Sequence, residues 1–167
     1  MILSSEYGSY YAKYVANVAG DDIAAALMNG LVSVPAFFEE IPTEKQEYRY
    51  AEGKWTPKEV LLHLIDCERV FMYRAMQIAR STNVHLEGFD QDEFVTNSNA
   101  NARDMDSLLK EFIAVRTATI HFIQGCNDTM LLKQGRASDS PLSVRAAAFI
   151  TRGHELHHLK IIKERYF

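Results

Sequence analysis

The sequence predicts an all-α protein in which a single domain, residues 1–167, folds as a four-helix bundle. Four long segments carry apolar residues at the three- and four-residue spacing of an amphipathic helix. Residues suited to helix ends flank these segments, and the alternation typical of β-strands is weak. Helices with one apolar face bury that face best against one another, which favours a bundle.

The first helical segment covers about residues 21–40. Its apolar stripe consists of Ile23, Ala26, Leu27, Leu31, Val34 and Phe38. A group of tyrosines precedes it, and we expect this group to form a further helical turn that packs across the end of the bundle. Its members are Tyr7, Tyr10, Tyr11 and Tyr14.

The second segment, about residues 56–80, has the clearest beginning. Thr56 suits the N-cap and Pro57 suits the first helical position. Glu59 completes a capping box three residues after the cap. The polar run that starts at Ser81 is expected to end this helix.

The third segment spans about residues 104–125, with Gly125 as its stop. The fourth spans about residues 143–166 and follows Pro141. Residues 130–135 are the one stretch that we expect to be extended.

The link between the second and third helices, residues 82–103, is longer than a helix hairpin needs. The second helix is about 37 Å long, whereas the link can reach over about 70 Å. It can therefore run back along the bundle and make these two helices parallel. The result is an up-down-down-up arrangement in which the second and fourth helices are antiparallel. The alternative is an up-down-up-down bundle with a long binding loop.

The composition argues against several function classes. The net charge is −4 and no basic stripe is visible, so nucleic-acid binding lacks its usual electrostatic basis. No stretch approaches the roughly 20 apolar residues that cross a bilayer. Cys67 and Cys126 form no metal or redox motif, and no basic, apolar leader opens the chain. We therefore expect a cytoplasmic protein with neither a nucleic-acid nor a membrane partner.

Two histidines in the fourth segment, His154 and His158, are four residues apart and project from the same helix face. This spacing allows both imidazoles to bind one divalent cation. His157 offers an alternative partner at three residues from His154. Gly153 costs about 1 kcal/mol inside a helix, so we expect it to admit a close neighbour.

His63 offers a third ligand. It lies about 10 Å beyond the cap of the second helix, and His158 lies about 12 Å before the end of the fourth. In an antiparallel pair of helices the two therefore lie at the same height. His63, His154 and His158 would form an open, catalytic type of metal site, since structural zinc sites have four protein ligands. Imidazole suits several divalent metals, and we favour zinc or nickel.

Other residues near this site have two interpretations each. Asp66 and Glu68 could orient a histidine or could simply be solvated. Cys67 is one turn beyond His63, where we expect a small core residue rather than a ligand. Trp55 is expected to pack at the end of the bundle.

Three residues are candidates for binding an anionic substrate, although we favour surface or interface positions for them: Tyr73, Arg74 and Arg116. Aromatic residues on the first and third helices exceed what we expect one small bundle to bury, and this predicts a homodimer. They are Phe37, Phe38, Phe112 and Phe122.

Several stretches resemble the DinB-like (YfiT/DinB) family of metal-dependent bundle proteins. They are residues 53–64, the Asp66-x-Glu68 pair, Asp90, Arg116 and the closing His154-x-x-x-His158. The resemblance implies an up-down-down-up bundle with a metal site at His63, His154 and His158. Similar proteins include transferases of low-molecular-weight thiols and mycothiol-dependent isomerases.

The favoured hypothesis is an enzyme whose metal activates a low-molecular-weight thiol for transfer to an electrophile. No residue is assigned a catalytic role, since no nucleophile with a positioned base is evident. Hydrolase or isomerase activity would use the same site. The alternatives from other classes are a non-catalytic metal- or small-molecule-binding bundle, with a possible link to stress, and a plain bundle that dimerises.

Overall fold

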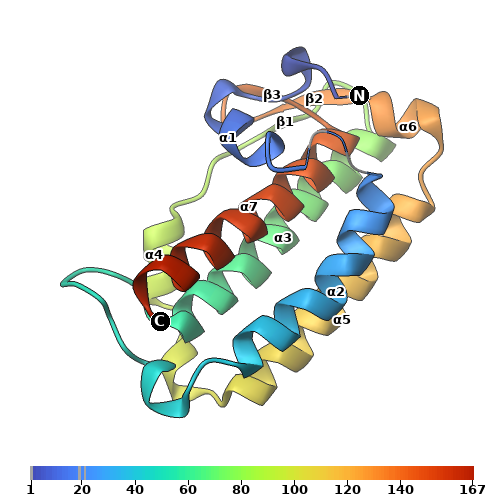
Figure 1. Ribbon diagram of the computed structural model, residues 1–167. Helices are drawn as coiled ribbons and strands as arrows, with labels where there is room; N and C mark the ends of the chain where they lie inside the picture. Colours follow the sequence, from blue (N-terminus) through green and yellow to red (C-terminus); the bar gives the residue numbers. More distant parts are fainter. Residues whose placement is uncertain (1, 19, 21) are drawn as a thin grey trace.

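The computed structural model describes residues 2–18, 20 and 22–167. Four long helices form a bundle: α2 (Ile23–Glu39), α3 (Pro57–Arg80), α5 (Met105–Gln124) and α7 (Val144–Arg165) (Figure 1). Their bounds lie within two residues of the expected ones, which confirms the predicted four-helix bundle. Asp22 caps α2 by accepting a hydrogen bond from the Ala25 amide, and the expected start at residue 21 lies outside the described residues.

The connectivity is the predicted up-down-down-up arrangement. In Figure 1, α2 and α7 run in one direction while α3 and α5 run in the other. The segment that joins α3 to α5 returns along the outside of the bundle and carries α4 (Gln91–Thr96). As a result α3 packs between α5 and the antiparallel α7, and this brings the histidine-bearing helices into contact.

Tyr10, Tyr11 and Tyr14 lie in short helical turns across one end of the bundle, as expected, whereas Tyr7 is extended and forms an isolated bridge with Leu142. The turns are a 3₁₀ helix at Ser9–Tyr11 and α1 (Ala12–Val15). Further 3₁₀ turns occur at Ser4–Glu6, Thr43–Lys45 and Ala100–Ala102. α1 packs on α7, so the N-terminal turns cover the helix that carries two of the candidate ligands.

A small sheet corrects the expectation for residues 130–135. The first part of that stretch is helical, within α6 (Asp128–Leu132), because Asn127 caps it by accepting from the Met130 amide. Strands β2 (Gln134–Ala137) and β3 (Ser140–Ser143) then form an antiparallel hairpin, and β1 (His85–Leu86) pairs with β2 in parallel. Ser138 and Asp139 form the hairpin turn with φ angles of 49° and 57°, the left-handed values of a type I′ turn.

The bundle interior consists of two apolar clusters separated by a polar layer. One cluster surrounds Leu27 and Phe71, and the other surrounds Phe38 and Phe112. Phe38 and Phe112 are fully buried, and Phe37 and Phe122 are partly buried. The premise that the bundle cannot bury these aromatic residues is therefore wrong, and a homodimer needs other support.

The polar layer is centred on Arg116, which is 1% exposed. Its guanidinium donates to both carboxylate oxygens of Glu68 on α3, each at 2.9 Å, and to Glu155 on α7 at 2.6 Å. Gly30 on α2 makes room for it, since an added Cβ there would lie 2.3 Å from Nη1 of Arg116. The layer thus links all four long helices.

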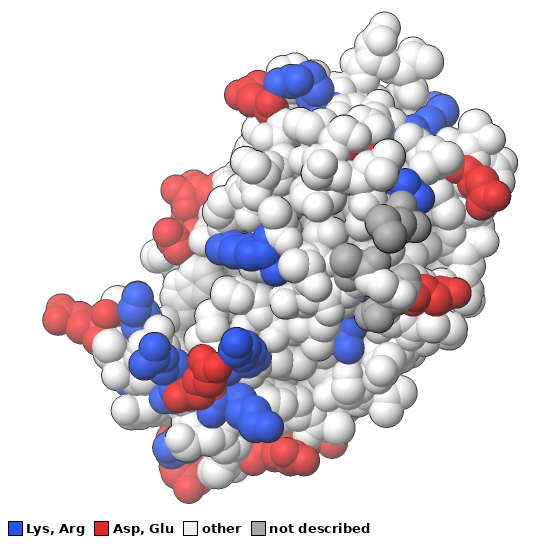
Figure 2. Space-filling model, turned by 45° about the horizontal axis from the view of Figure 1, so that its top comes forward, with Lys and Arg blue, Asp and Glu red and all other residues white. Residues whose placement is uncertain are grey.

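The surface carries charges of both signs. On the face drawn in Figure 2, Lys and Arg side chains are interspersed with Asp and Glu side chains. None of the described helices is long and apolar enough to cross a membrane.

Replacing Arg116 with methionine should lower the free energy of unfolding by about 3–5 kcal/mol, because the change leaves Glu68 as a buried charge without a cation and Glu155 with Arg152 alone. Urea denaturation measures the effect. The control is Arg69→Met, which removes two ion pairs of an exposed arginine, to Asp66 on α3 and to Glu111 on α5, and should cost less than about 1 kcal/mol. Equal losses in the two variants would contradict a structural role for the polar layer.

Candidate metal centre

The three predicted ligands are positioned by two well-defined helices. The capping box fixes the start of α3: the Thr56 hydroxyl accepts from the Glu59 amide at 3.1 Å, and the Glu59 carboxylate accepts from the Thr56 amide at 2.7 Å. His63 follows in the second turn of α3 and faces α7. His154 and His158 lie one turn apart on α7. The structure thus brings these three residues together.

The imidazole rings meet at their Nε2 atoms. Nε2 of His154 lies 3.1 Å from Nε2 of His63 and 2.9 Å from Nε2 of His158. One nitrogen from each ring lies within 4.8 Å of the others. His63 and His154 are buried and His158 is half-buried. Three nitrogens that converge in the interior form a donor set of the kind that binds a divalent cation.

Burial keeps these imidazoles neutral at physiological pH. It lowers the pKa of His63 to about 4 and that of His158 to about 3. The pKa of His154 also lies well below its ordinary value, first because of burial and then because of the neighbouring histidines. Since a neutral nitrogen is the form that binds a metal, the cluster is ready for one without losing protons.

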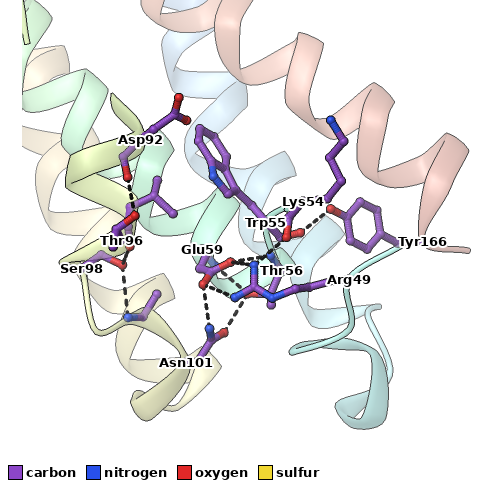
Figure 3. A network of polar contacts seen from close by, with 12 residues as sticks. Arg49, Lys54, Trp55, Thr56, Glu59, Asp92, Thr96, Ser98, Asn101 and Tyr166 are labelled. Carbon is purple, nitrogen blue, oxygen red and sulfur yellow. Dashed lines mark hydrogen bonds and ion pairs between the residues drawn. The ribbon is translucent and has the colours of Figure 1, made fainter. Parts of the chain in front are cut away.

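Trp55 belongs to the site rather than to bundle-end packing alone, which corrects the sequence interpretation. Its ring centroid lies 4.6 Å from that of His63, and it stacks on His158 at 6.3 Å with an interplanar angle of 17°. Figure 3 shows how its backbone is held: the Tyr166 hydroxyl donates to the Trp55 carbonyl.

Glu59 anchors the same turn in Figure 3. Its carboxylate accepts hydrogen bonds from Arg49 at 2.7 and 2.8 Å and from Asn101 at 2.9 Å. This network joins the beginning of α3 to the segments before and after it in the chain. It therefore fixes the position of Trp55 over the histidines.

Gly153 has the close neighbour that the sequence predicted. An added Cβ would lie 2.0 Å from the Tyr14 carbonyl oxygen, so only glycine allows α1 to pack here. Asn17 donates to the Gly153 carbonyl at 3.1 Å and holds the contact together. The Tyr14 ring then packs edge-on against His154, with 5.0 Å between centroids.

Other candidates lie apart from the three converging nitrogens. The His157 ring packs against Tyr14 and does not join the group. Of the two interpretations left open for Asp66 and Glu68, orientation of a histidine is not found, because Asp66 accepts from Arg69 and Glu68 accepts from Arg116. Solvation is wrong for Glu68, which is buried. Asp90, part of the family-like pattern, caps α4 by accepting from the Asp92 and Glu93 amides.

The residues considered for anion binding differ in their surroundings. Tyr73 is 51% exposed, in agreement with a surface position. Arg116 is 1% exposed and is engaged by the carboxylates of the polar layer, so the expected surface position is wrong for this residue. The same expectation is wrong for Arg74, which is also buried. Its spacing of 11 residues from His63 returns it to the same helix face, a signal that the sequence contains.

Cys67 is a buried thiol beside His63. Its Sγ lies 3.6 Å from Nδ1 of His63, and burial raises its pKa to about 12. The thiol therefore stays protonated at neutral pH, as expected of a small core residue.

Two cavities reach the histidine cluster. One of about 230 Å³ is lined by His154 and Cys67, and one of about 350 Å³ is lined by His158 and Trp55. Small molecules can therefore approach different ligands of the same centre.

The metal-free protein should become less stable as the pH falls from 7 to 5. Imidazoles of the unfolded chain, with a pKa near 6.5, become protonated in this range, whereas the imidazoles of the folded cluster stay neutral. Each such group lowers the free energy of unfolding by about 1.4 kcal/mol per pH unit. Urea denaturation at several pH values in the presence of a chelator measures this. His63→Gln should show a shallower decrease, and an unchanged slope would contradict the burial of a neutral imidazole.

The chain matches the model of the DinB superfamily over residues 33–162. The solved structure of YfiT from Bacillus subtilis, described as a probable metal-dependent hydrolase with an unusual four-helix bundle topology, has the same fold. The TM-score is 0.72 at 17% identity, over 84% of each chain. No curated protein matches in sequence. Because the family match covers well over half of its length, the chain belongs to the DinB superfamily.

Proposed function

We propose that His63, His154 and His158 bind one divalent metal, zinc or nickel, and that this centre activates a low-molecular-weight thiol for transfer to an electrophile. The observation that carries the proposal is the convergence at one point of three neutral imidazoles, two of them buried and one half-buried. Membership of the DinB superfamily and the description of YfiT as a probable metal-dependent hydrolase support a metal-dependent function.

The residues present fit a metal. Tetrahedral ligands at 2.0–2.1 Å from zinc are about 3.3 Å apart, close to the 3.1 and 2.9 Å between the Nε2 atoms. Within the described part of the chain, no fourth histidine, cysteine or carboxylate joins this group. Three protein ligands leave a position open to a substrate, as in catalytic zinc sites.

A bound divalent metal would lower the pKa of a thiol that binds to it, so that a thiolate is available at neutral pH. In the transfer, the thiol proton leaves to solvent and the sulfur forms a bond to the electrophilic carbon. The leaving group departs with the electrons of the bond that breaks.

The chain contributes the surroundings of this reaction. Trp55 and Tyr14 pack aromatic rings against the histidines and form part of the walls of the two cavities. The cavities at His154 and His158 accommodate two separate small-molecule substrates.

Hydrolysis is the second candidate, favoured by the description of YfiT. Water in place of the thiol would turn the same open site into a hydrolase site. A bundle that only binds a metal is the non-catalytic alternative.

Removing a ligand should weaken metal binding by more than about 100-fold, since loss of even an outer partner of a ligand costs about 10–100-fold. Titration calorimetry with zinc and with nickel compares His63→Ala and His154→Ala with the parent. The matched control is His157→Ala on the same helix, which should leave the affinity nearly unchanged. A large loss in His157→Ala with normal binding by His158→Ala would overturn the ligand assignment.

Metal-loaded protein should transfer low-molecular-weight thiols to a chromogenic electrophile, and His154→Ala should reduce the rate to the background. The release of chromophore measures the rate, and circular dichroism checks that the variant keeps its helices. Equal rates in His154→Ala and the parent would show that the metal centre is not the catalyst. A bound metal with turnover of esters or amides alone would favour hydrolysis.

We also propose a homodimer, which is now supported by an apolar groove instead of by the aromatic residues of α2 and α5. The apolar surface that supports it is a groove between α3 and α5, lined by Met72, Tyr73, Met76, Val115 and Phe122 among others. Light scattering should give a molecular mass twice that of the chain, and Met76→Glu should reduce this mass to that of a single chain. A monomeric parent at high concentration would exclude the dimer.

A further inference from the structure

The cavity of about 230 Å³ beside His154 has a charged residue in its wall. The cavity is lined by α3, α7, the N-terminal turns, the segment after β1 and the hairpin turn between β2 and β3. Cys67 and His154 lie in its wall, and Arg74 contributes a guanidinium. The remaining lining is largely aromatic, with Tyr11, Phe71 and Phe89 among its members.

Arg74 is a buried cation without a carboxylate partner. Its exposed fraction is 2%, yet no Asp or Glu of the described residues lies within ion-pairing distance of it. The other buried cations differ in this respect: Lys58 pairs with Glu47, Arg116 with Glu68 and Glu155, and Arg152 with Glu155. Burying a charge without a counter-charge is costly, so an anion at Arg74 would be strongly favoured.

Neutral groups hold the Arg74 side chain in place. One guanidinium nitrogen donates to the Glu87 carbonyl at 2.8 Å and to the Ser138 hydroxyl at 3.1 Å. The guanidinium carbon lies 5.7 Å from the ring centroids of both Phe71 and Phe89. These contacts orient the planar fork without balancing its charge. The other two guanidinium nitrogens can donate charge-assisted hydrogen bonds to a carboxylate.

Arg74 and the histidine cluster share one face of α3. Eleven residues separate His63 from Arg74, which is close to three full turns, or about 16 Å along the axis. Side chains on a helix lean toward its N-terminus, so the arginine extends toward His63 and shortens that distance. Cys67 and Phe71 lie on the same face between them. A ligand held at the guanidinium therefore extends along an aromatic wall toward the histidines.

We propose that this cavity binds a small organic carboxylate, with its carboxylate on Arg74 and its apolar body between the aromatic rings. Naming this ligand as the electrophilic substrate of the thiol transfer rests on the proposed function, whereas the binding itself does not. Arg74 is then the residue that selects for negatively charged substrates. Phe71 and Tyr11 favour an unsaturated or aromatic body, and the enclosed volume restricts it to a small molecule.

Binding of benzoate and of its uncharged counterpart benzamide tests the proposal. Both are titrated by calorimetry into metal-free protein, so that no carboxylate can bind to a metal instead. The parent should bind benzoate at least about tenfold more tightly than benzamide, because only benzoate supplies the missing charge. Arg74→Gln should abolish this preference and Arg74→Lys should retain part of it. The control is Arg80→Gln, which removes an exposed arginine from the same helix and should keep the preference.

A parent that binds benzoate no more tightly than benzamide, or an Arg74→Gln variant that keeps the preference, overturns the proposal. The melting temperature of metal-free Arg74→Gln is a second measurement. It should equal or exceed that of the parent, because an uncompensated charge is removed, whereas an arginine with a structural role would lower it. If this variant does not fold, the comparison of benzoate with benzamide in the parent and in Arg74→Lys decides the proposal. A preference that Arg74→Lys partly loses supports the proposal, and no preference in the parent, or an equal preference in the two proteins, overturns it.

The outcomes separate this inference from the proposed function. Benzoate selectivity in a protein that transfers no thiol would support the carboxylate site and reject the reaction. Thiol transfer by a protein without benzoate selectivity would do the reverse.

Discussion

The structure depends on the polar layer that crosses the middle of the bundle. A buried guanidinium and two carboxylates have to meet with good geometry, because each would be strongly destabilising alone. Arg116, Glu68 and Glu155 come from α5, α3 and α7, and Gly30 of α2 leaves the necessary space. This requirement fixes the positions of the helices along the bundle axis more strictly than apolar contacts, which tolerate sliding. His154 directly precedes Glu155, so the constraint that aligns α3 with α7 also aligns the histidines.

The polar layer differs from the histidine cluster and Arg74 in whether its polar groups have partners within the chain. Arg116 and its carboxylates satisfy one another within the chain. Nε2 of His154 lies 3.1 Å from Nε2 of His63 and 2.9 Å from Nε2 of His158, and Arg74 has no carboxylate partner among the described residues. Groups of the first kind stabilise a fold, whereas groups of the second kind are typical of sites that bind something. The paired charges of the polar layer thus lie beside the histidine cluster, which a cation would complete, and beside Arg74, which an anion would complete.

Local signals explain what the sequence could predict. The capping box at Thr56 and Glu59 set the start of α3, and the length of the link to α5 indicated the topology. Together these two signals predict that His63 lies at the same height along the bundle as His158. Contacts between residues on different helices are harder to predict, because periodicity shows that a residue faces inward but not which residue it contacts. The sequence therefore leaves Glu68 open between a histidine partner and a solvated residue, without indicating Arg116, and it predicts only packing for Trp55. Of the strands it predicts only the beginning of β2, because the strands are short and include Gly135 and Pro141.

The most direct test of this account is an anomalous-scattering map from crystals of the zinc- or nickel-loaded protein. The account predicts one metal for each chain, with Nε2 atoms of His63, His154 and His158 at about 2.0–2.1 Å if the metal is zinc. It also predicts a coordination position that no protein atom occupies. A metal bound through His157, a fourth protein ligand that closes the site, or no anomalous peak between α3 and α7 would contradict it.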